Sequence, residues 1–296
     1  MLIKKVVHTY KVINNHEIKA DSYSLNDDTL HPVIIWIHGG ALILGNREII
    51  PSEQVEMYVK AGFTVVSVDY RLAPETKLAN IVEDIQDAYN WVREKGPELF
   101  NIDTNRIGII GQSGGGYLAL MTGFCVDPRP SALVSFYGYG DISGAWYSRP
   151  DKFYCKQPVV SKEEAYKAVG GSVISSTPIQ SDRGLFYLYC RQNGLWPKEV
   201  TGHDPDTDDD YFDSFCPIRN VSKEYPPTLL LHGTADTDVP YDQSVMMANE
   251  LARVGTTHEL FTIPDGGHVF DFVGLGEPKV ANAFSHVLTF LEQHTR

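Results

Sequence analysis

Hydrophobic and polar positions follow one pattern at the start of the chain and another further along. Residues 5–13 and 17–25 alternate between apolar and polar side chains on either side of Asn14-Asn15. This alternation predicts two antiparallel strands joined by a tight turn. From Pro32 onward, short continuous apolar runs alternate with helical stretches, a pattern typical of buried parallel strands joined by crossover helices.

The alternating part of the sequence gives a specific list of elements. The expected strands are residues 33–37, 63–68, 106–110, 132–136, 228–231 and 258–263. The expected helices, several with apolar residues three or four positions apart, are residues 52–61, 79–94, 114–125, 243–254 and 278–293. Their order predicts an α/β fold with a mostly parallel, doubly wound sheet.

The rhythm breaks in residues 140–225, where Gly, Pro, Tyr and Asp are frequent and the helical pieces are short. We expect this segment to be a cap inserted into a catalytic core that consists of residues 1–139 and 226–296. A cap over a site must present an inner face, and binding pockets are mainly apolar and aromatic. The aromatic candidates for a substrate pocket are Trp146, Tyr147 and Trp196, together with Phe153 and Tyr187.

Composition and charge narrow the possible functions. The chain has 296 residues, of which 43% are apolar and 21% charged, and no stretch approaches the roughly 18 consecutive apolar residues of a membrane span. A net charge of −13 without a concentrated basic face argues against binding to nucleic acid or to an anionic membrane. The first residues lack an apolar signal core, and the four cysteines are scattered, so we expect a cytoplasmic location.

A short motif in the middle of the chain predicts a nucleophile. Residues 111–115 read GQSGG, which fits G-x-S-x-G, and they follow an apolar strand and precede a predicted helix. This context is that of a nucleophile elbow, in which small residues let the backbone turn sharply and expose the serine. Ser113 is therefore the expected nucleophile.

The remaining partners of a serine nucleophile are found near the ends of later strands. His268 lies in a DGGH segment just after the last predicted strand, where its imidazole can act as the general base. Asp236 follows the strand at 228–231 and is the expected carboxylate that orients the histidine, with Asp238 as its competitor. We favour Asp236 because it is nearer the strand end, and we expect Asp238 to cap the following helix.

These motifs together resemble the hormone-sensitive-lipase-like branch of carboxylesterases, and the order serine, acid, histidine is that of α/β-hydrolases. The resemblance rests on HGGA at 38–41, DYRLAPE at 69–75, GQSGG at 111–115, HGTAD at 232–236 and GGH at 266–268. It implies an oxyanion hole formed by the backbone N–H groups of Gly40, Ala41 and Gly114, with structural roles for Asp69 and Arg71.

The chain also departs from that branch at three positions. Ala41 stands where the branch usually has a third glycine, Gln112 where it has an acid, and Gly114 where it has alanine. The glycine after the serine and the GGHVF ending also resemble peptidase-like and polysaccharide-esterase-like relatives of the same fold. The substrate class is therefore less well determined than the mechanism.

The expected activity is hydrolysis of small to medium carboxylic esters through an acyl-enzyme, with no metal or organic cofactor. Two alternatives stay open. The first is hydrolysis of an amide or a small peptide by the same residues, and the second is a non-catalytic ligand-binding protein built on the same fold. The sequence does not determine the oligomeric state.

One acidic run could suggest a metal site. Residues 203–210 read HDPDTDDD, which resembles the start of a calcium loop, but the glycine and the distal glutamate of that loop are missing. We expect a solvated acidic loop here.

Overall fold

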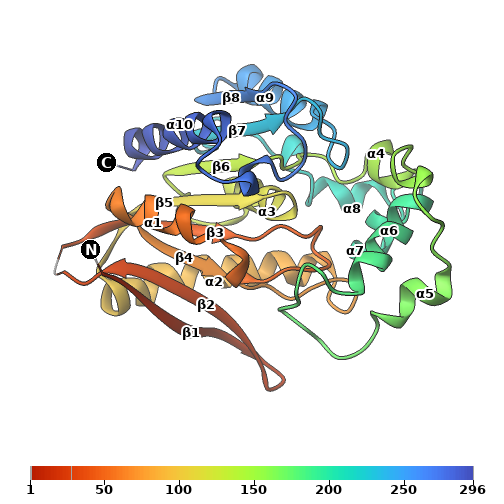
Figure 1. The fold of residues 1–296 in the computed structure, drawn as a ribbon, viewed down its shortest axis with the longest axis horizontal. Coiled ribbons are helices and arrows are strands. Elements are labelled where there is room, and N and C mark those ends of the chain that lie inside the picture. Colours follow the sequence, from red (N-terminus) through yellow and green to blue (C-terminus); the bar gives the residue numbers. More distant parts are fainter. Residues whose placement is uncertain (1, 28, 296) are drawn as a thin grey trace.

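The computed structural model describes residues 2–27 and 29–295, and its centre is an eight-stranded sheet with helices on both faces (Figure 1). The strand order is β1-β2-β4-β3-β5-β6-β7-β8. The pairs β1–β2 and β2–β4 are antiparallel, and every later pair is parallel. The strands are β1 (Ile3–Ile13), β2 (His16–Leu25), β3 (His31–Ile37), β4 (Thr64–Val68), β5 (Ile102–Gln112), β6 (Ala132–Phe136), β7 (Thr228–Gly233) and β8 (His258–Ile263).

Ten α-helices and four short 3-10 helices accompany the sheet in the described part of the chain. The α-helices are α1 (Ser52–Lys60), α2 (Leu78–Phe100), α3 (Gly114–Cys125), α4 (Ala145–Ser148), α5 (Lys162–Lys167), α6 (Arg183–Asn193), α7 (Trp196–Thr201), α8 (Asp209–Asp213), α9 (Asp242–Val254) and α10 (Pro278–His294). The 3-10 helices are η1 (Arg47–Ile49), η2 (Tyr154–Lys156), η3 (Pro217–Arg219) and η4 (Phe270–Val273).

The predicted α/β fold with a mostly parallel, doubly wound sheet is confirmed, and so is the opening hairpin. Asn14 and Asn15 connect β1 to β2 with φ angles of 49° and 65°. Two-residue hairpin turns with positive φ at both central positions match the twist of the flanking strands, and asparagine tolerates this conformation better than most residues.

The main difference from the predicted elements lies between α2 and β5. The expected helix ended at residue 94, whereas α2 continues to Phe100 and contains Pro97. Gly96 and Pro97 signal a helix end in a sequence. In the structure Gly96 instead lets the side chains of Ile102 and Phe100 pack closely, since a Cβ there would lie 2.5 Å from Ile102 Cδ1.

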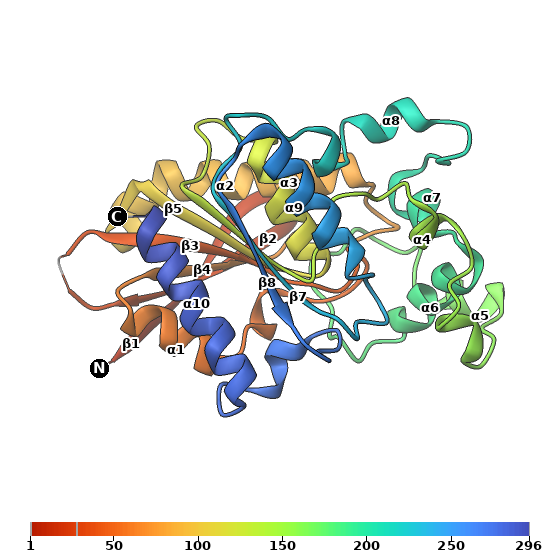
Figure 2. The same cartoon turned by 90° about the horizontal axis from the view of Figure 1, so that it is seen from above.

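Side chains of each buried strand point alternately to the two faces of the sheet. On β3, Ile35 and Ile37 belong to the hydrophobic cluster that includes side chains of α2, α3 and α9, whereas Ile34 and Trp36 belong to the cluster that includes side chains of α1 and α10. Figure 2 shows these two helix layers on opposite sides of the sheet. Because both faces are covered, the strands read as continuous apolar runs.

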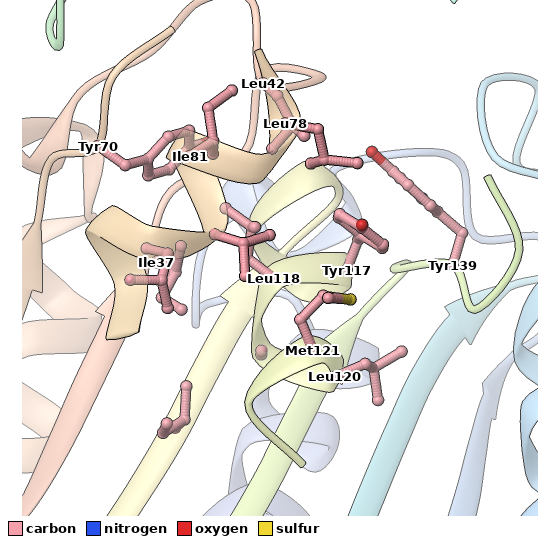
Figure 3. Packing of buried hydrophobic residues seen from close by; sticks show 14 of the residues in the cluster. Ile37, Leu42, Tyr70, Leu78, Ile81, Tyr117, Leu118, Leu120, Met121 and Tyr139 are labelled. Carbon is pink, nitrogen blue, oxygen red and sulfur yellow. The ribbon is translucent and has the colours of Figure 1, made fainter. Parts of the chain in front are cut away.

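Helices α4 to α8 lie together at one end of the sheet, between β6 and β7 in the chain (Figures 1 and 2). Their buried side chains belong to the same hydrophobic cluster as α2 and α3. Figure 3 shows one part of that cluster, which includes Leu42 of the loop after β3, Leu78 and Ile81 of α2 and Leu118 of α3. The loop after β3 is thus anchored in the core. The boundaries of a cap at residues 140–225 remain a proposal.

Candidate active site

Ser113 lies in a sharp turn between β5 and α3. Its φ and ψ angles are 52° and −119°, a conformation that costs a non-glycine residue about 1–3 kcal/mol. A Cβ on Gly111 would lie 2.0 Å from the backbone oxygen of Gly115, and one on Gly115 would lie 2.2 Å from that of Ile37. Only glycine fits at both positions, and this explains why small residues flank the serine.

The three residues predicted to form the triad lie within hydrogen-bond distance of one another. His268 Nε2 is 3.1 Å from Ser113 Oγ, and His268 Nδ1 is 2.7 Å from Asp236 Oδ2. Asp236 Oδ1 accepts the backbone N–H groups of Asp238 at 2.8 Å and Val239 at 3.0 Å. These bonds fix the carboxylate, so that its other oxygen faces the imidazole.

The surroundings of these residues keep Asp236 ionised and favour the protonated form of His268. Burial raises the pKa of Asp236, but hydrogen bonds from His232 and His268 outweigh it and hold this pKa well below its usual value. Burial lowers the pKa of His268, but Asp238 and Asp236 outweigh it and raise this pKa above its ordinary 6.5. The carboxylates therefore stabilise the imidazolium form.

This shift predicts the acid limb of the pH profile. A general base must be neutral to accept a proton, so activity is lost as the pH falls through the pKa of His268. Since that pKa lies above 6.5, we expect kcat/KM for a neutral ester to decrease already between pH 8 and pH 6, by about tenfold per unit on the limb. A full pH profile measures it, and a midpoint below 6.5 would contradict the raised pKa.

Asp238 does not cap a helix, contrary to the expectation from sequence. The N-cap of α9 is Tyr241, whereas Asp238 Oδ1 accepts the hydroxyl of Tyr187 at 2.5 Å and Arg191 Nη1 at 2.7 Å. Both partners come from α6, far along the chain. The other oxygen, Oδ2, lies 3.4 Å from Nε2 of His268, so Asp238 belongs to the site.

The predicted oxyanion donors converge beside the serine. Gly40 and Ala41 have φ angles of 104° and 54°, which turn the loop after β3 toward α3. A Cβ on Gly114 would lie only 3.2 Å from Ala41 N and 3.1 Å from Leu42 N, so glycine lets this loop approach closely. Across residues 2–27 and 29–295, the N–H groups of Gly40, Ala41 and Gly114 have no hydrogen-bond acceptor, as donors reserved for an oxyanion require.

Asp271, which the sequence analysis missed, is fully buried next to the triad. Its carboxylate accepts hydrogen bonds from Gln54, Gln112 and Tyr137. The ring of Tyr137 lies against His268, with centroids 4.6 Å apart. Burial raises the pKa of Asp271 to about 6, although the hydrogen bonds from Tyr137 and Gln54 oppose the shift. Gln112 stands where the resembled branch has an acid, and Asp271 places a carboxylate against it from the 3-10 helix η4.

A cavity of about 330 Å³ opens above the serine. Its wall includes Ser113, His268 and residues 39–41 of the loop after β3, and its volume is at the small end for ligand pockets, which hold about 300–1,000 Å³. The apolar side chains of the wall are Leu44, Ile49, Ile179, Val269 and Phe272, and the other aromatic or charged ones are Tyr137, Tyr187 and Asp238.

The prediction that Trp146, Tyr147 and Trp196 line the pocket is wrong, since none of them is in this wall. Trp196 is fully buried and donates its indole N–H to Ala41 O at 2.9 Å. Its ring stacks on Tyr147 with centroids 4.1 Å apart, and Tyr147 stacks on Trp146 at 3.8 Å. The three stacked rings thus support the loop after β3, which carries Ala41, on the side away from the cavity. Of the two further candidates, Tyr187 lines the cavity and Phe153 does not.

Other residues singled out by the sequence lie outside the cavity wall. Asp69 accepts hydrogen bonds from Arg47, and Arg71 pairs with buried Asp84. In the described residues 2–27 and 29–295, no group of three or more His, Cys, Asp or Glu side chains could hold a metal ion, including the acidic run at 203–210. None of the helices in that part of the chain is long and apolar enough to cross a membrane.

Two family models match separate parts of this chain: BD-FAE over residues 22–143 and the prolyl oligopeptidase family over residues 183–296. The chain is 28% identical to the non-reducing polyketide synthase ausA of Emericella nidulans, over 88% of this chain and 13% of that protein. It is also 28% identical to the non-reducing polyketide synthase Preu3 of Preussia isomera, over 86% of this chain and 12% of that protein. The chain thus spans about an eighth of the length of these curated relatives.

Solved structures resemble nearly the whole chain. A protein of unknown function from Staphylococcus aureus subsp. aureus Mu50 has a TM-score of 0.81 at 20% identity, covering 98% of this chain and 100% of that one. An alpha/beta hydrolase superfamily protein from Enterococcus faecalis has a TM-score of 0.74 at 24% identity, covering 99% of each chain. A bacterial heroin esterase has a TM-score of 0.72 at 23% identity, covering 100% of this chain and 84% of that one.

Proposed function

We propose that this chain, which has the α/β-hydrolase fold and resembles the hormone-sensitive-lipase-like carboxylesterases, hydrolyses small to medium carboxylic esters through an acyl-enzyme on Ser113. One observation carries the proposal. Ser113 and His268, 3.1 Å apart, line an apolar cavity, and His268 is held by Asp236 at 2.7 Å, beside three backbone N–H groups that have no acceptor among the described residues.

The reaction follows from the positions of these atoms. Ser113 Oγ attacks the ester carbonyl carbon while His268 Nε2 takes its proton, and Asp236 stabilises the imidazolium that forms. The N–H groups of Gly40, Ala41 and Gly114 donate to the oxyanion of the tetrahedral intermediate. The intermediate collapses when His268 returns the proton to the leaving alcohol. Water, activated by the same histidine, then attacks the acyl-enzyme and releases the acid.

The size of the cavity predicts the acyl preference. A volume of about 330 Å³ has to hold the whole reacting part of the substrate, and long acyl chains would extend past the exposed rim residues Val269 and Phe272. We expect kcat/KM to be highest for acetyl to hexanoyl esters and to fall by about tenfold or more for palmitoyl, because part of the chain would remain in water. A series of p-nitrophenyl esters measures this, and a maximum at palmitoyl would contradict it.

Labelling with a fluorophosphonate probe tests the proposal itself. A serine activated by a base reacts with this probe, so we expect stoichiometric labelling of the native chain and none after Ser113→Ala. Labelling without turnover of any ester in the panel would support an active serine and contradict the ester substrate.

A second candidate function is amide or small-peptide hydrolysis on the same residues. It is supported by the match of the prolyl oligopeptidase family to residues 183–296, which contain both Asp236 and His268. Matched p-nitrophenyl esters and p-nitroanilides with the same acyl group separate the two activities. An acyl thioester belongs in the same panel because the curated relatives are polyketide synthases.

A further inference from the structure

We propose that Asp238 forms a leaving-group subsite that selects esters whose alcohol carries a positively charged ammonium group. This inference rests on the proposed function, because it names the substrate class for the same site. It begins from the carboxylate that was expected to cap a helix and instead lines the cavity.

One oxygen of Asp238 is held by two hydrogen-bond donors, and the other lies beside His268. Oδ1 is held by Tyr187 and Arg191 at 2.5 Å and 2.7 Å, so the carboxylate has a fixed orientation. Oδ2 faces His268 Nε2 at 3.4 Å, and the side chain, which lines the cavity, is 18% exposed. A carboxylate that is rigid, largely desolvated and lines the cavity is suited to binding a cation.

The position of Oδ2 assigns it to the leaving group. His268 Nε2 is the atom that protonates the departing oxygen, so the alcohol must pass close to it. Because Oδ2 lies 3.4 Å from the same nitrogen, the first few atoms beyond the ester oxygen come next to Asp238. The acyl group extends from the carbonyl carbon instead.

The rest of the wall favours a cation as well. Among the described residues of this wall, Asp238 is the carboxylate and none is Lys or Arg. Arg191 lies behind the wall with its side chain 1% exposed, and it is paired with both Asp238 and Asp151. Tyr137, Tyr187 and Phe272 add aromatic rings to the wall, and aromatic rings with a carboxylate are the surroundings that quaternary ammonium groups prefer.

The test compares two esters of nearly equal shape: butyrylcholine and 3,3-dimethylbutyl butyrate, in which a carbon replaces the ammonium nitrogen. At constant ionic strength, we expect kcat/KM to be about tenfold higher for the cationic ester. Asp238→Asn should bring this ratio close to one, whereas Asp265→Asn, the same charge change on the exposed loop before His268, should leave it unchanged. A ratio that is equal in the native chain and in Asp238→Asn would overturn the proposal.

A binding measurement keeps the subsite testable apart from hydrolysis. Choline and 3,3-dimethylbutanol are titrated calorimetrically into Ser113→Ala and into Ser113→Ala with Asp238→Asn. We expect choline to bind more tightly than the neutral alcohol, and only while Asp238 is present. If no ester is hydrolysed but choline binding depends on Asp238, the esterase proposal fails and the subsite stands. Equal binding of both alcohols contradicts the subsite whatever the hydrolysis assays show.

Discussion

We expect Ser113→Ala to lower kcat for p-nitrophenyl acetate by about 10⁴-fold or more, because the only atom removed is the one proposed to attack the carbonyl. Within residues 2–27 and 29–295, the hydroxyl has no hydrogen-bond partner besides His268 Nε2 at 3.1 Å. The strained turn is held by the backbone instead, through Ser113 N–H donating to Phe136 O at 2.9 Å and Tyr117 N–H donating to Ser113 O at 2.9 Å.

The variant should therefore remain folded with an intact cavity. We expect its thermal unfolding midpoint to lie within about 2 °C of that of the native chain, as is usual for a change that removes no structural contact. The control for contaminating esterases is the same preparation assayed with and without fluorophosphonate pretreatment. Retention of more than about 1% of the native kcat in that variant would assign the nucleophile to another residue.

The sequence predicted which residues would meet because the motifs follow strands of a parallel sheet. Ser113 directly follows β5, and Asp236 and His268 lie on the loops after β7 and β8. Parallel strands present their carboxyl ends at one edge, so residues distant in sequence come together there. Short motifs beside continuous apolar runs therefore carried enough information for both the fold and this grouping.

The pocket could not be predicted in the same way. Aromatic residues in an irregular segment are equally suited to a core and to a binding surface, and their number does not distinguish the two. Trp196 became part of the core because its indole N–H found Ala41 O from another segment, 155 residues away. Packing of this kind depends on the tertiary structure and leaves no periodic signal.

The acids of the site show the same limit. Asp238 and Arg191 are 47 residues apart, and Asp271 meets Gln112 across 159 residues. From the local sequence, Asp238 was expected to cap the next helix. Its contact with Tyr187 of α6 depends on the tertiary fold. The only sequence signal for Asp271 was an acid three positions after His268, and its burial follows from the tertiary fold.

Asp236→Asn has the second large expected effect. The carboxamide oxygen can still accept the backbone N–H groups of Asp238 and Val239, which leaves the NH₂ group facing His268 Nδ1. The imidazole then has to accept at Nδ1 and carry its proton on Nε2. It can no longer take a proton from Ser113, and an equivalent change in a serine protease costs about 10⁴ in kcat.

Asp238→Asn is the matched comparison, since it removes the same charge from a second carboxylate beside His268, at 3.4 Å from Nε2. We expect its kcat for p-nitrophenyl acetate to stay at least about 100-fold above that of Asp236→Asn, because the tautomer of the imidazole is set at Nδ1 and not at Nε2. The acid limb of its pH profile should move to lower pH, since Asp238 raises the pKa of His268.

For Asp236→Asn, thermal unfolding shows whether the fold is retained, and kcat measured up to pH 10 separates a wrong tautomer from a simple pKa shift. A wrong tautomer leaves kcat low at every pH, whereas a pKa shift alone would leave the plateau at its native height. If Asp238→Asn had the larger loss, the orienting carboxylate would have to be reassigned to Asp238.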